Sequence, residues 1–328
     1  MVEVGYHDSV KLLQAAEWNT PGPFARPAWF ARLEESGLQP VVALAREGDA
    51  MMALPLMKRD GALVPLANWY SFTWQPLATH GADPERLMTA LARDLKRHAA
   101  ILDLSLLPDE DDTASRVQRA LRGSGWRVEL LQSDTNHVLQ ATGLDYAHYC
   151  ESLPGTLRTS LKRKAKKLAV EIQTCFDEKS WAHYEAIYAA SWKPEEGDPA
   201  LLRAFARDEG AAGRLRFALA RHDGVPVAAQ FWTVQDGTAY IHKLAYLETH
   251  RKLSAGTVLT AALMERVLDT DRVSLVDFGT GDDGYKAGWM NHARPRFRLL
   301  ALNPADPRAW PAMARRAARK LASSLRRR

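Results

Sequence analysis

Two segments far apart in this chain carry the same succession of expected elements. Residues 40–56 and 215–231 each contain two apolar runs joined by a short turn, Gly48-Asp49 in the first and Asp223-Gly224 in the second. Such runs predict β-hairpins. Each hairpin precedes a long expected helix and a buried strand, and Ala-Leu-Ala-Arg enters both turns. We therefore predict an α/β fold with mixed sheets, built by tandem duplication of one unit. The alternative is a chance recurrence in a chain rich in Ala and Arg.

The predicted boundary between the units lies near residue 141. This gives an N-terminal unit of residues 1–140 and a C-terminal unit of residues 141–306, in which a helical insertion, Tyr146 to Gly213, precedes the hairpin. Residues 307–328 form a basic tail with eight Lys/Arg and no acid. The chain's net charge of +5 therefore leaves −3 for the rest, with 36 Lys/Arg against 39 Asp/Glu. That distribution argues against a nucleic-acid-binding face spread over the fold.

Apolar periodicity places further elements in the N-terminal unit. We expect helices at 26–36, 83–96 and 113–121, a buried strand at 101–106, and two closing strands near 126–131 and 137–140.

The composition points to a cytoplasmic enzyme. The N-terminus has no basic start followed by an apolar run, and no window approaches the ~18 apolar residues of a membrane span. Cys150 and Cys175 are the only cysteines, and the ten histidines show no metal-binding spacing. We therefore expect no metal site.

A basic turn after a strand is the candidate phosphate site. The expected strand at 238–246 is followed by Arg251-Lys252-Leu253-Ser254-Ala255-Gly256, and a helix begins near Thr257. Small residues at a helix start let backbone N–H groups and the helix dipole face a phosphate, and Arg251 and Lys252 add positive charge. The alternative is an ordinary helix start with Ser254 as its N-cap.

This turn resembles the Q/R-x-x-G-x-G/A coenzyme A loop of the GNAT acetyltransferase superfamily. Arg251, Ser254 and Gly256 occupy its three defining positions, with Ser254 replacing the usual first glycine. Other segments resemble, in the same order, the CelD-like and BioF2-like acetyltransferase subgroup, which is related to the Fem peptidyltransferases. These segments are Leu153–Arg158, Lys243–Tyr246, Ser254–Thr257, Asp277–Gly279 and Tyr285–Lys286. The resemblance covers residues 140–305 well and the first 140 residues only by the order of elements.

The resemblance implies an acyltransferase with acyl-CoA as its co-substrate and no permanently bound cofactor. The loop residues that would hold the donor are Arg251, Lys252, Ser254, Ala255, Gly256 and Thr257. It also implies an amine acceptor on an envelope lipid or saccharide precursor, with a sphingoid amine as one concrete candidate.

The segment from Asp277 to Trp289 suits transfer to an amine. The attacking amine must lose a proton, and the developing oxyanion needs a donor. We expect Asp277 to orient the acceptor or accept its proton, Lys286 to stabilise the oxyanion or bind phosphate, and Tyr285 to protonate the leaving thiolate. The Tyr285-Lys286-Ala287-Gly288-Trp289 run resembles a late element of the Fem enzymes, which makes Trp289 a substrate-binding candidate. The alternative is that Asp277 caps a loop, Lys286 faces solvent and Tyr285 packs in the core.

Two further base candidates lie on or after the preceding strand. His242 and Lys243 are neighbours on a strand, so we expect them on opposite faces. His242 is a candidate base, with a hydrogen-bonded core histidine as the alternative. Glu248 follows the strand end and is placed to act as a base through water.

Two other groups are candidates for substrate binding. The basic helix after residue 157 places Arg158 and Lys162 for contact with an anionic acceptor or carrier, and the alternative is a solvated face. Trp69 and Trp74 belong to an aromatic run that would line a channel for a long chain, although packing explains such residues more often.

The tail has the pattern of a basic amphipathic helix, with Trp310, Met313, Leu321 and Leu325 on one face. It predicts reversible peripheral contact with anionic lipid at the inner membrane face, or docking on the acidic body of the protein. Two other functions stay open. One is an aminoacyl-tRNA-dependent peptidyltransferase of the Fem type, which would need a larger basic surface. The other is a non-catalytic membrane adaptor for envelope polysaccharide synthesis.

Overall fold

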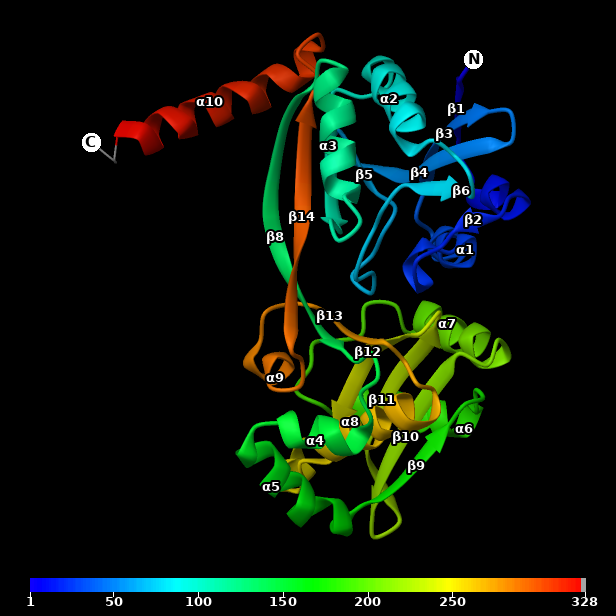
Figure 1. Ribbon diagram of the computed structural model, residues 1–328, viewed down its shortest axis with the longest axis vertical. Helices are drawn as coiled ribbons and strands as arrows, with labels where there is room; N and C mark the ends of the chain where they lie inside the picture. Colours follow the sequence, from blue (N-terminus) through cyan, green and yellow to red (C-terminus); the bar gives the residue numbers. More distant parts are fainter. Residues whose placement is uncertain (326–328) are drawn as a thin grey trace. The chain divides into compact units, whose positions relative to one another are not determined.

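The computed structural model describes residues 1–325 and divides the chain into two compact units. Unit 1 comprises Met1–Asp134 together with the part of the chain that begins at Pro295, and unit 2 is Thr135–Arg294. Both units combine helices with mixed sheet (Figure 1). Among the described helices, none combines the length and the apolar character that a membrane crossing requires.

In unit 1, β5 and β7 pair in parallel, whereas β1 with β3, β3 with β4, β4 with β5, and β7 with β14 pair antiparallel. The strand order is β1 (Glu3–His7), β3 (Pro40–Glu47), β4 (Ala50–Arg59), β5 (Ala62–Pro65), β7 (Ile101–Leu107), β14 (His292–Leu302) and β8 (Arg127–Gln140). The short strands β2 (Trp18–Asn19) and β6 (Leu77–Thr79) pair beside this path. The helices of the unit are α1 (Pro27–Glu35), α2 (Pro84–Asp94), α3 (Thr113–Gly123) and α10 (Trp310–Leu325).

The strands of unit 2 include one parallel pair, β12 and β13. Their order is β8, β13 (Leu275–Thr280), β12 (Thr238–Tyr246), β11 (Val225–Gln235), β10 (Leu215–His222) and β9 (Ala169–Gln173). The helices are α4 (Tyr146–Ser152), α5 (Gly155–Lys164), α6 (Glu178–Ala189), α7 (Pro199–Ala211), α8 (Ala255–Glu265) and α9 (Gly284–Ala287). A buried apolar cluster joins α8 to the sheet through Val258, Leu259, Trp232 and Ile241.

The two units repeat one plan, which confirms the predicted α/β fold of duplicated units. The succession β3, β4, β5, β7, β14 in unit 1 corresponds to β10, β11, β12, β13, β8 in unit 2. In each case two antiparallel pairings lead to one parallel pairing, and a helix (α2 or α8) precedes the second strand of that pair. The last strand of each series comes from a distant part of the chain.

The structure differs from the sequence-based expectations in three places. The two closing strands expected near 126–131 and 137–140 form one continuous strand, β8, because its polar middle keeps extended backbone. The expected helical insertion contains a strand, β9, which pairs with β10. Residues 295–302, expected in the C-terminal unit, group with unit 1, because this part of β14 pairs with β7 from Phe297 to Leu302.

The start of the basic tail contacts unit 1. Met313 packs against a small buried cluster of Ala100, Leu302 and Ala309, and Arg316 forms an ion pair with Glu129. Trp310, expected on the same face as Met313, is 56% exposed. The side chains of Leu321 and Leu325 lie outside the described residues. The first turns of α10 therefore agree with the alternative that the tail docks on the body of the protein.

Candidate active site

The expected phosphate turn lies at the N-terminus of α8. Residues Glu248–Leu253 form a single 3₁₀ segment after β12, and Ser254 follows in left-handed backbone with φ of +50°. This conformation favours glycine, the residue that the resemblance places there. No side chain caps α8, because the Ser254 hydroxyl instead accepts a hydrogen bond from Lys164 Nζ at 2.7 Å. The first N–H groups of α8 have no partner within the helix, and the ammonium group of Lys164 lies beside this helix start.

Gly256 packs closely against β12. A Cβ atom there would lie 3.2 Å from Leu244 Cδ2 and 3.3 Å from Leu244 Cδ1, both on the neighbouring strand β12. Larger residues would therefore push the first turn of α8 away from the sheet. The glycine keeps the helix start close to the end of β12.

Strands β12 and β13 pair only at their beginnings. The parallel pairing runs from Thr238↔Leu275 to Tyr240↔Asp277, although β12 continues to Tyr246 and β13 to Thr280. The end of β12 leads into the α8 turn, and the end of β13 leads into the loop that carries Tyr285 and Lys286. The candidate catalytic segment thus follows the strand beside the candidate donor loop.

Tyr285 contacts α8 directly. Its hydroxyl lies 3.2 Å from Thr260 Oγ1, although 40% of the residue as a whole is exposed. Burial raises the pKa of Tyr285, and its hydrogen bond with Thr260 opposes that shift. The phenol therefore keeps its proton at neutral pH, as a proton donor must. Lys286 Nζ donates to the Thr280 carbonyl and lies 5.8 Å from the centroid of the Phe278 ring.

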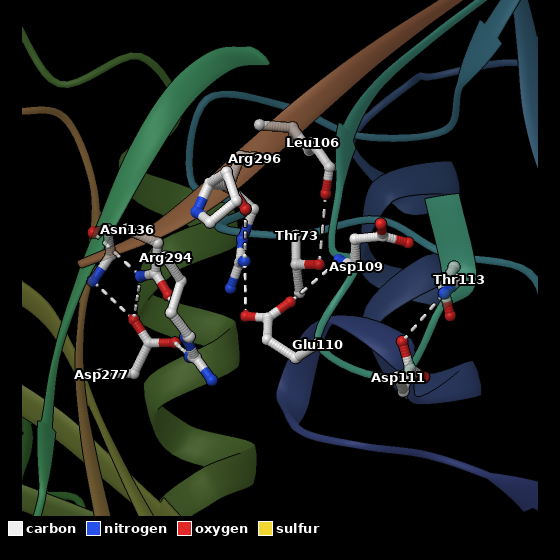
Figure 2. Close-up of polar contacts among 12 residues, drawn as sticks. Thr73, Leu106, Asp109, Glu110, Asp111, Thr113, Asn136, Asp277, Arg294 and Arg296 are labelled. Atoms are coloured by element: carbon white, nitrogen blue, oxygen red, sulfur yellow. Dashed lines mark hydrogen bonds and ion pairs between the residues drawn. The ribbon is translucent and has the colours of Figure 1, made fainter. Parts of the chain in front are cut away.

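Asp277 is held by a network of donors. It is 5% exposed and accepts from Asn136 Nδ2 and the Gly279 N–H, each at 2.7 Å, while Arg294 forms an ion pair at 3.2 Å. Figure 2 shows these side chains converging, and Asn136 Oδ1 also accepts from Arg294. This geometry favours a structural role for Asp277, tying β13 to β8 and β14, over proton transfer with substrate.

A β-bulge changes the expected orientation of His242. The pairing of β11 with β12 shifts between Phe231↔Lys243 and Trp232↔Ile241, which leaves His242 as the extra residue. His242 stacks on Phe231 and bonds Thr233 Oγ1 at 2.8 Å, while Lys243 lies over the Tyr188 ring of α6. Both side chains therefore face α6 and α7, and the expectation of opposite faces is wrong. The packing of His242 is that of a hydrogen-bonded core histidine.

The bulge brings Lys243 into a polar cluster that sequence patterns did not reveal. Lys243 is 9% exposed and forms an ion pair with Glu196 at 2.8 Å, and Tyr184 Oη donates to the same carboxylate at 3.0 Å. Burial lowers the pKa of Lys243, and Glu196 opposes the shift. Nearby, burial lowers the pKa of Lys193 to about 8, with the positive charges of Lys243 and Lys286 acting in the same direction and Glu196 opposing them.

The remaining charged and small candidates all lie in unit 2. Arg251, Lys252 and Glu248 are exposed around the 3₁₀ segment. On α5, Arg158 and Lys162 are exposed. Ala255 is buried in the first turn of α8, and Thr257 is partly buried there.

The three tryptophans differ in access. Trp69 is 58% exposed in unit 1, whereas Trp74 is 1% exposed and donates its indole N–H to the Pro55 carbonyl. In unit 2, Trp289 is 2% exposed, and its carbonyl accepts from Tyr149 Oη. Trp74 and Trp289 are thus core residues, as the packing alternative expects, and only Trp69 is accessible.

Three residues near the candidate donor and acceptor sides carry no signal in the sequence. Lys164 was one of several cations on a basic helix, and only folding places it on Ser254. Lys193 and Glu196 lie in the loop between α6 and α7, outside any motif. The neighbouring Trp192 packs on Tyr246 at the end of β12, with ring centroids 4.3 Å apart, which places this loop across β12.

Comparison with known proteins finds a family match for the segment that contains α5, α8 and α9. Residues 155–287, from α5 to α9, match the family model described as acetyltransferase (GNAT) domain. No curated protein matches the chain significantly. The match supports the superfamily, and the CelD-like and BioF2-like subgroup stays a prediction.

Solved structures share the fold over nearly the whole chain. FemX has a TM-score of 0.65 at 11% identity, covering 92% of this chain and 98% of that one. The C-terminal domain of a putative lysylphosphatidylglycerol synthetase from Agrobacterium fabrum has a TM-score of 0.56 at 15% identity, covering 87% and 90%. A tandem GNAT protein from the clavulanic acid biosynthesis pathway has a TM-score of 0.52 at 13% identity, covering 93% and 100%. Residues 155–287 therefore resemble a GNAT acetyltransferase domain, and the solved structures show that the chain shares the fold of tandem GNAT proteins.

Proposed function

We propose that this protein transfers an acyl group from acyl-CoA to an amine. The observation that carries the proposal is the uncapped N-terminus of α8, where Lys164 meets Ser254 and where Gly256 lies against β12. Exposed N–H groups at a helix start, a positive dipole end and nearby cations suit the pyrophosphate of coenzyme A. Arg251 and Lys252 would add charge for the donor's phosphates.

Two residues supply the chemistry. The neutral amine attacks the thioester carbonyl, and the tetrahedral intermediate collapses with loss of the coenzyme A thiolate. Tyr285, protonated and close to α8, would donate a proton to that thiolate. Lys286 would leave the Thr280 carbonyl to stabilise the oxyanion or a phosphate. Glu248 stays a candidate base acting through water.

Donor binding tests the proposal. Thermal unfolding would be followed with coenzyme A and with acyl-CoAs of increasing chain length, since a ligand that binds the folded state raises its stability. We expect stabilisation by coenzyme A and a preferred chain length. If none of these compounds stabilises the protein, acyl-CoA is not its donor. Lys286→Ala should keep this stabilisation and lose turnover.

We propose that the acceptor is an envelope lipid or saccharide precursor, a sphingoid amine included. One structural neighbour is named for a lipid product, lysylphosphatidylglycerol. Cytoplasmic location with peripheral membrane contact through α10 is part of this proposal. Vesicle flotation tests it: deletion of residues 307–328 should release the protein from anionic vesicles, and persistent binding would place the contact elsewhere.

A donor of the aminoacyl-tRNA type is the second candidate, favoured by the fold shared with FemX and by the cations of α5. RNase-sensitive tRNA that co-purifies with the protein, together with no response to coenzyme A, would replace the first proposal with this one.

A further inference from the structure

A cavity of about 750 Å³ in unit 2 has no role in the chemistry above. It lies against α6, the loop of residues 190–198 and the start of α7. Much of its wall is apolar, formed by Trp181, Tyr184, Tyr188, Pro194, Pro199 and Leu202. Cavities of this size and character hold small organic molecules.

Most charged side chains along this wall form ion pairs, whereas Lys193 and the exposed Glu195 form none among the described residues. Glu185 pairs with Arg203 at 2.5 Å, and Glu196 pairs with Lys243 at 2.8 Å. Lys193 also lines the cavity, and its Nζ lies 5.9 Å from the ring centroids of both Tyr188 and Trp192. Among the described residues, no carboxylate lies within 4.0 Å of this ammonium group. A partly buried cation without an ion-pair partner is stabilised when an anion binds beside it.

The surroundings of Lys193 favour an anion over a cation. Lys243 and Lys286 both contribute positive potential there, while Glu196 and Asp283 oppose it. Glu196 is already engaged by Lys243 and by the Tyr184 hydroxyl. An ammonium ligand would therefore meet repulsion at Lys193, and Glu195, the lining carboxylate without an ion pair, is exposed to solvent, whereas a carboxylate or phosphate would pair with Lys193.

We propose that this cavity binds an acyl acceptor with an apolar body and an anionic group, and that Lys193 is the counter-charge for that group. The identification of this ligand as the acyl acceptor rests on the proposed acyl transfer. Lys286, the residue proposed to act on the oxyanion, lies near enough to contribute to the electrostatics of Lys193. The anionic end of the ligand would thus lie toward the reacting groups, with the apolar body along α6 and α7.

Calorimetric titration without any acyl donor tests this binding. The probes are octanoate, octyl phosphate, octylamine and octanol, each below its micelle concentration. We expect the two anions to bind about tenfold more tightly than octanol, in line with one charge-assisted contact. The relative affinities of octanoate and octyl phosphate distinguish a carboxylate from a phosphate ligand. If octylamine binds as tightly as the anions, the proposal is overturned.

Variants separate the anion contact from the apolar wall. Lys193→Gln should remove the preference for anions, Lys193→Arg should keep it, and Lys179→Gln, an exposed lysine at the start of α6, should leave it unchanged. Ala200→Phe, at the exposed rim of the cavity, should weaken all four probes together. Unaltered anion selectivity in folded Lys193→Gln, checked by its melting curve, would exclude Lys193.

The two proposals fail separately. Loss of anion binding with intact stabilisation by coenzyme A would leave the acyl transfer standing. Anion binding without any response to coenzyme A would support the cavity as a binding site. It would contradict the identification of its ligand as the acyl acceptor.

Discussion

The two units start corresponding helices in opposite ways. Both α2 and α8 precede the second strand of the parallel pair in their sheet. In unit 1, Asp83 caps α2, and its carboxylate accepts from the Glu85 and Arg86 N–H groups at 3.1 Å. In unit 2, Ser254 gives α8 no side-chain cap and is bound by Lys164 instead.

This difference would explain how a scaffold that is present twice holds the single donor site that we propose. A carboxylate at the start of α2 satisfies the helix N–H groups and would repel a phosphate. An uncapped start with a lysine beside it, as at α8, leaves the same groups for a ligand. The fold alone therefore does not locate the site, and the chemistry of a single capping position separates the two units.

Ser254→Asp should make α8 resemble α2 and gives the largest expected effect. Asp tolerates left-handed backbone, so the fold should persist, and its carboxylate would occupy the helix start. We expect acyl-CoA affinity to fall about 100-fold, which corresponds to ~2.8 kcal/mol. Calorimetric titration measures it, and Ser254→Gly is the control that should bind as well as the natural protein. Equal binding by the Asp variant would refute the α8 site.

Lys164→Gln removes the cation that distinguishes α8 from α2. We expect about a tenfold loss of acyl-CoA affinity, because a charge-assisted contact is replaced by a neutral one. The remaining affinity should depend less on salt. Lys167→Gln, an exposed lysine in the next turn, is the matched control. An effect of the same size in the control would reduce the interaction to general surface charge.

Asp83→Ala removes the N-cap of α2 and tests the same comparison in unit 1. We expect the free energy of unfolding to fall by ~1 kcal/mol, the usual effect of losing an N-cap. Acyl-CoA affinity and turnover should not change. Urea unfolding and a turnover assay measure the two quantities, and altered donor affinity would mean that unit 1 takes part in donor binding.

The two units also differ in how they hold one shielded cation each. In unit 1, Arg296 is 3% exposed and pairs with Glu110 at 2.6 Å (Figure 2), whereas Lys193 in unit 2 has a pKa lowered from 10.5 to about 8. Between pH 8 and 10.5 the unfolded state binds more protons at Lys193, so this residue makes stability rise with pH across that range. Lys193→Met should therefore be more stable than the natural protein at pH 7, with the difference shrinking toward pH 10. Urea unfolding at both pH values measures this, and a constant difference would contradict the shift.

Much of the fold was predictable because periodicity and turn residues act locally. Residues 40–56, 215–231 and 238–246 form the expected strands, and the helices at 84–94 and 113–123 follow their apolar spacing. Pairing across long separations was not predictable. Nothing in residues 295–302 indicates that they pair with β7, nearly 200 residues earlier along the chain.

The candidate site was partly predictable for the same reason. The turn at Ser254 and the segment at Tyr285 are local patterns, and folding brings both to α8. The β-bulge at His242 was invisible, because a single extra residue in one strand leaves the alternation of residue types nearly unchanged. Without the bulge Lys243 would face α8, and the pairing with Glu196 would not form.

The use of β14 in unit 1 bears on how this chain folds during synthesis. Unit 2 is continuous from Thr135 to Arg294, but unit 1 needs residues 295–302 for the strand beside β7. Domains generally fold as units while the chain emerges from the ribosome, N-terminal first. Here the order is reversed. Unit 1, although synthesised first, cannot complete its sheet until unit 2 has been synthesised. Until then β7 has an unpaired edge, and chaperones would be needed most at that edge.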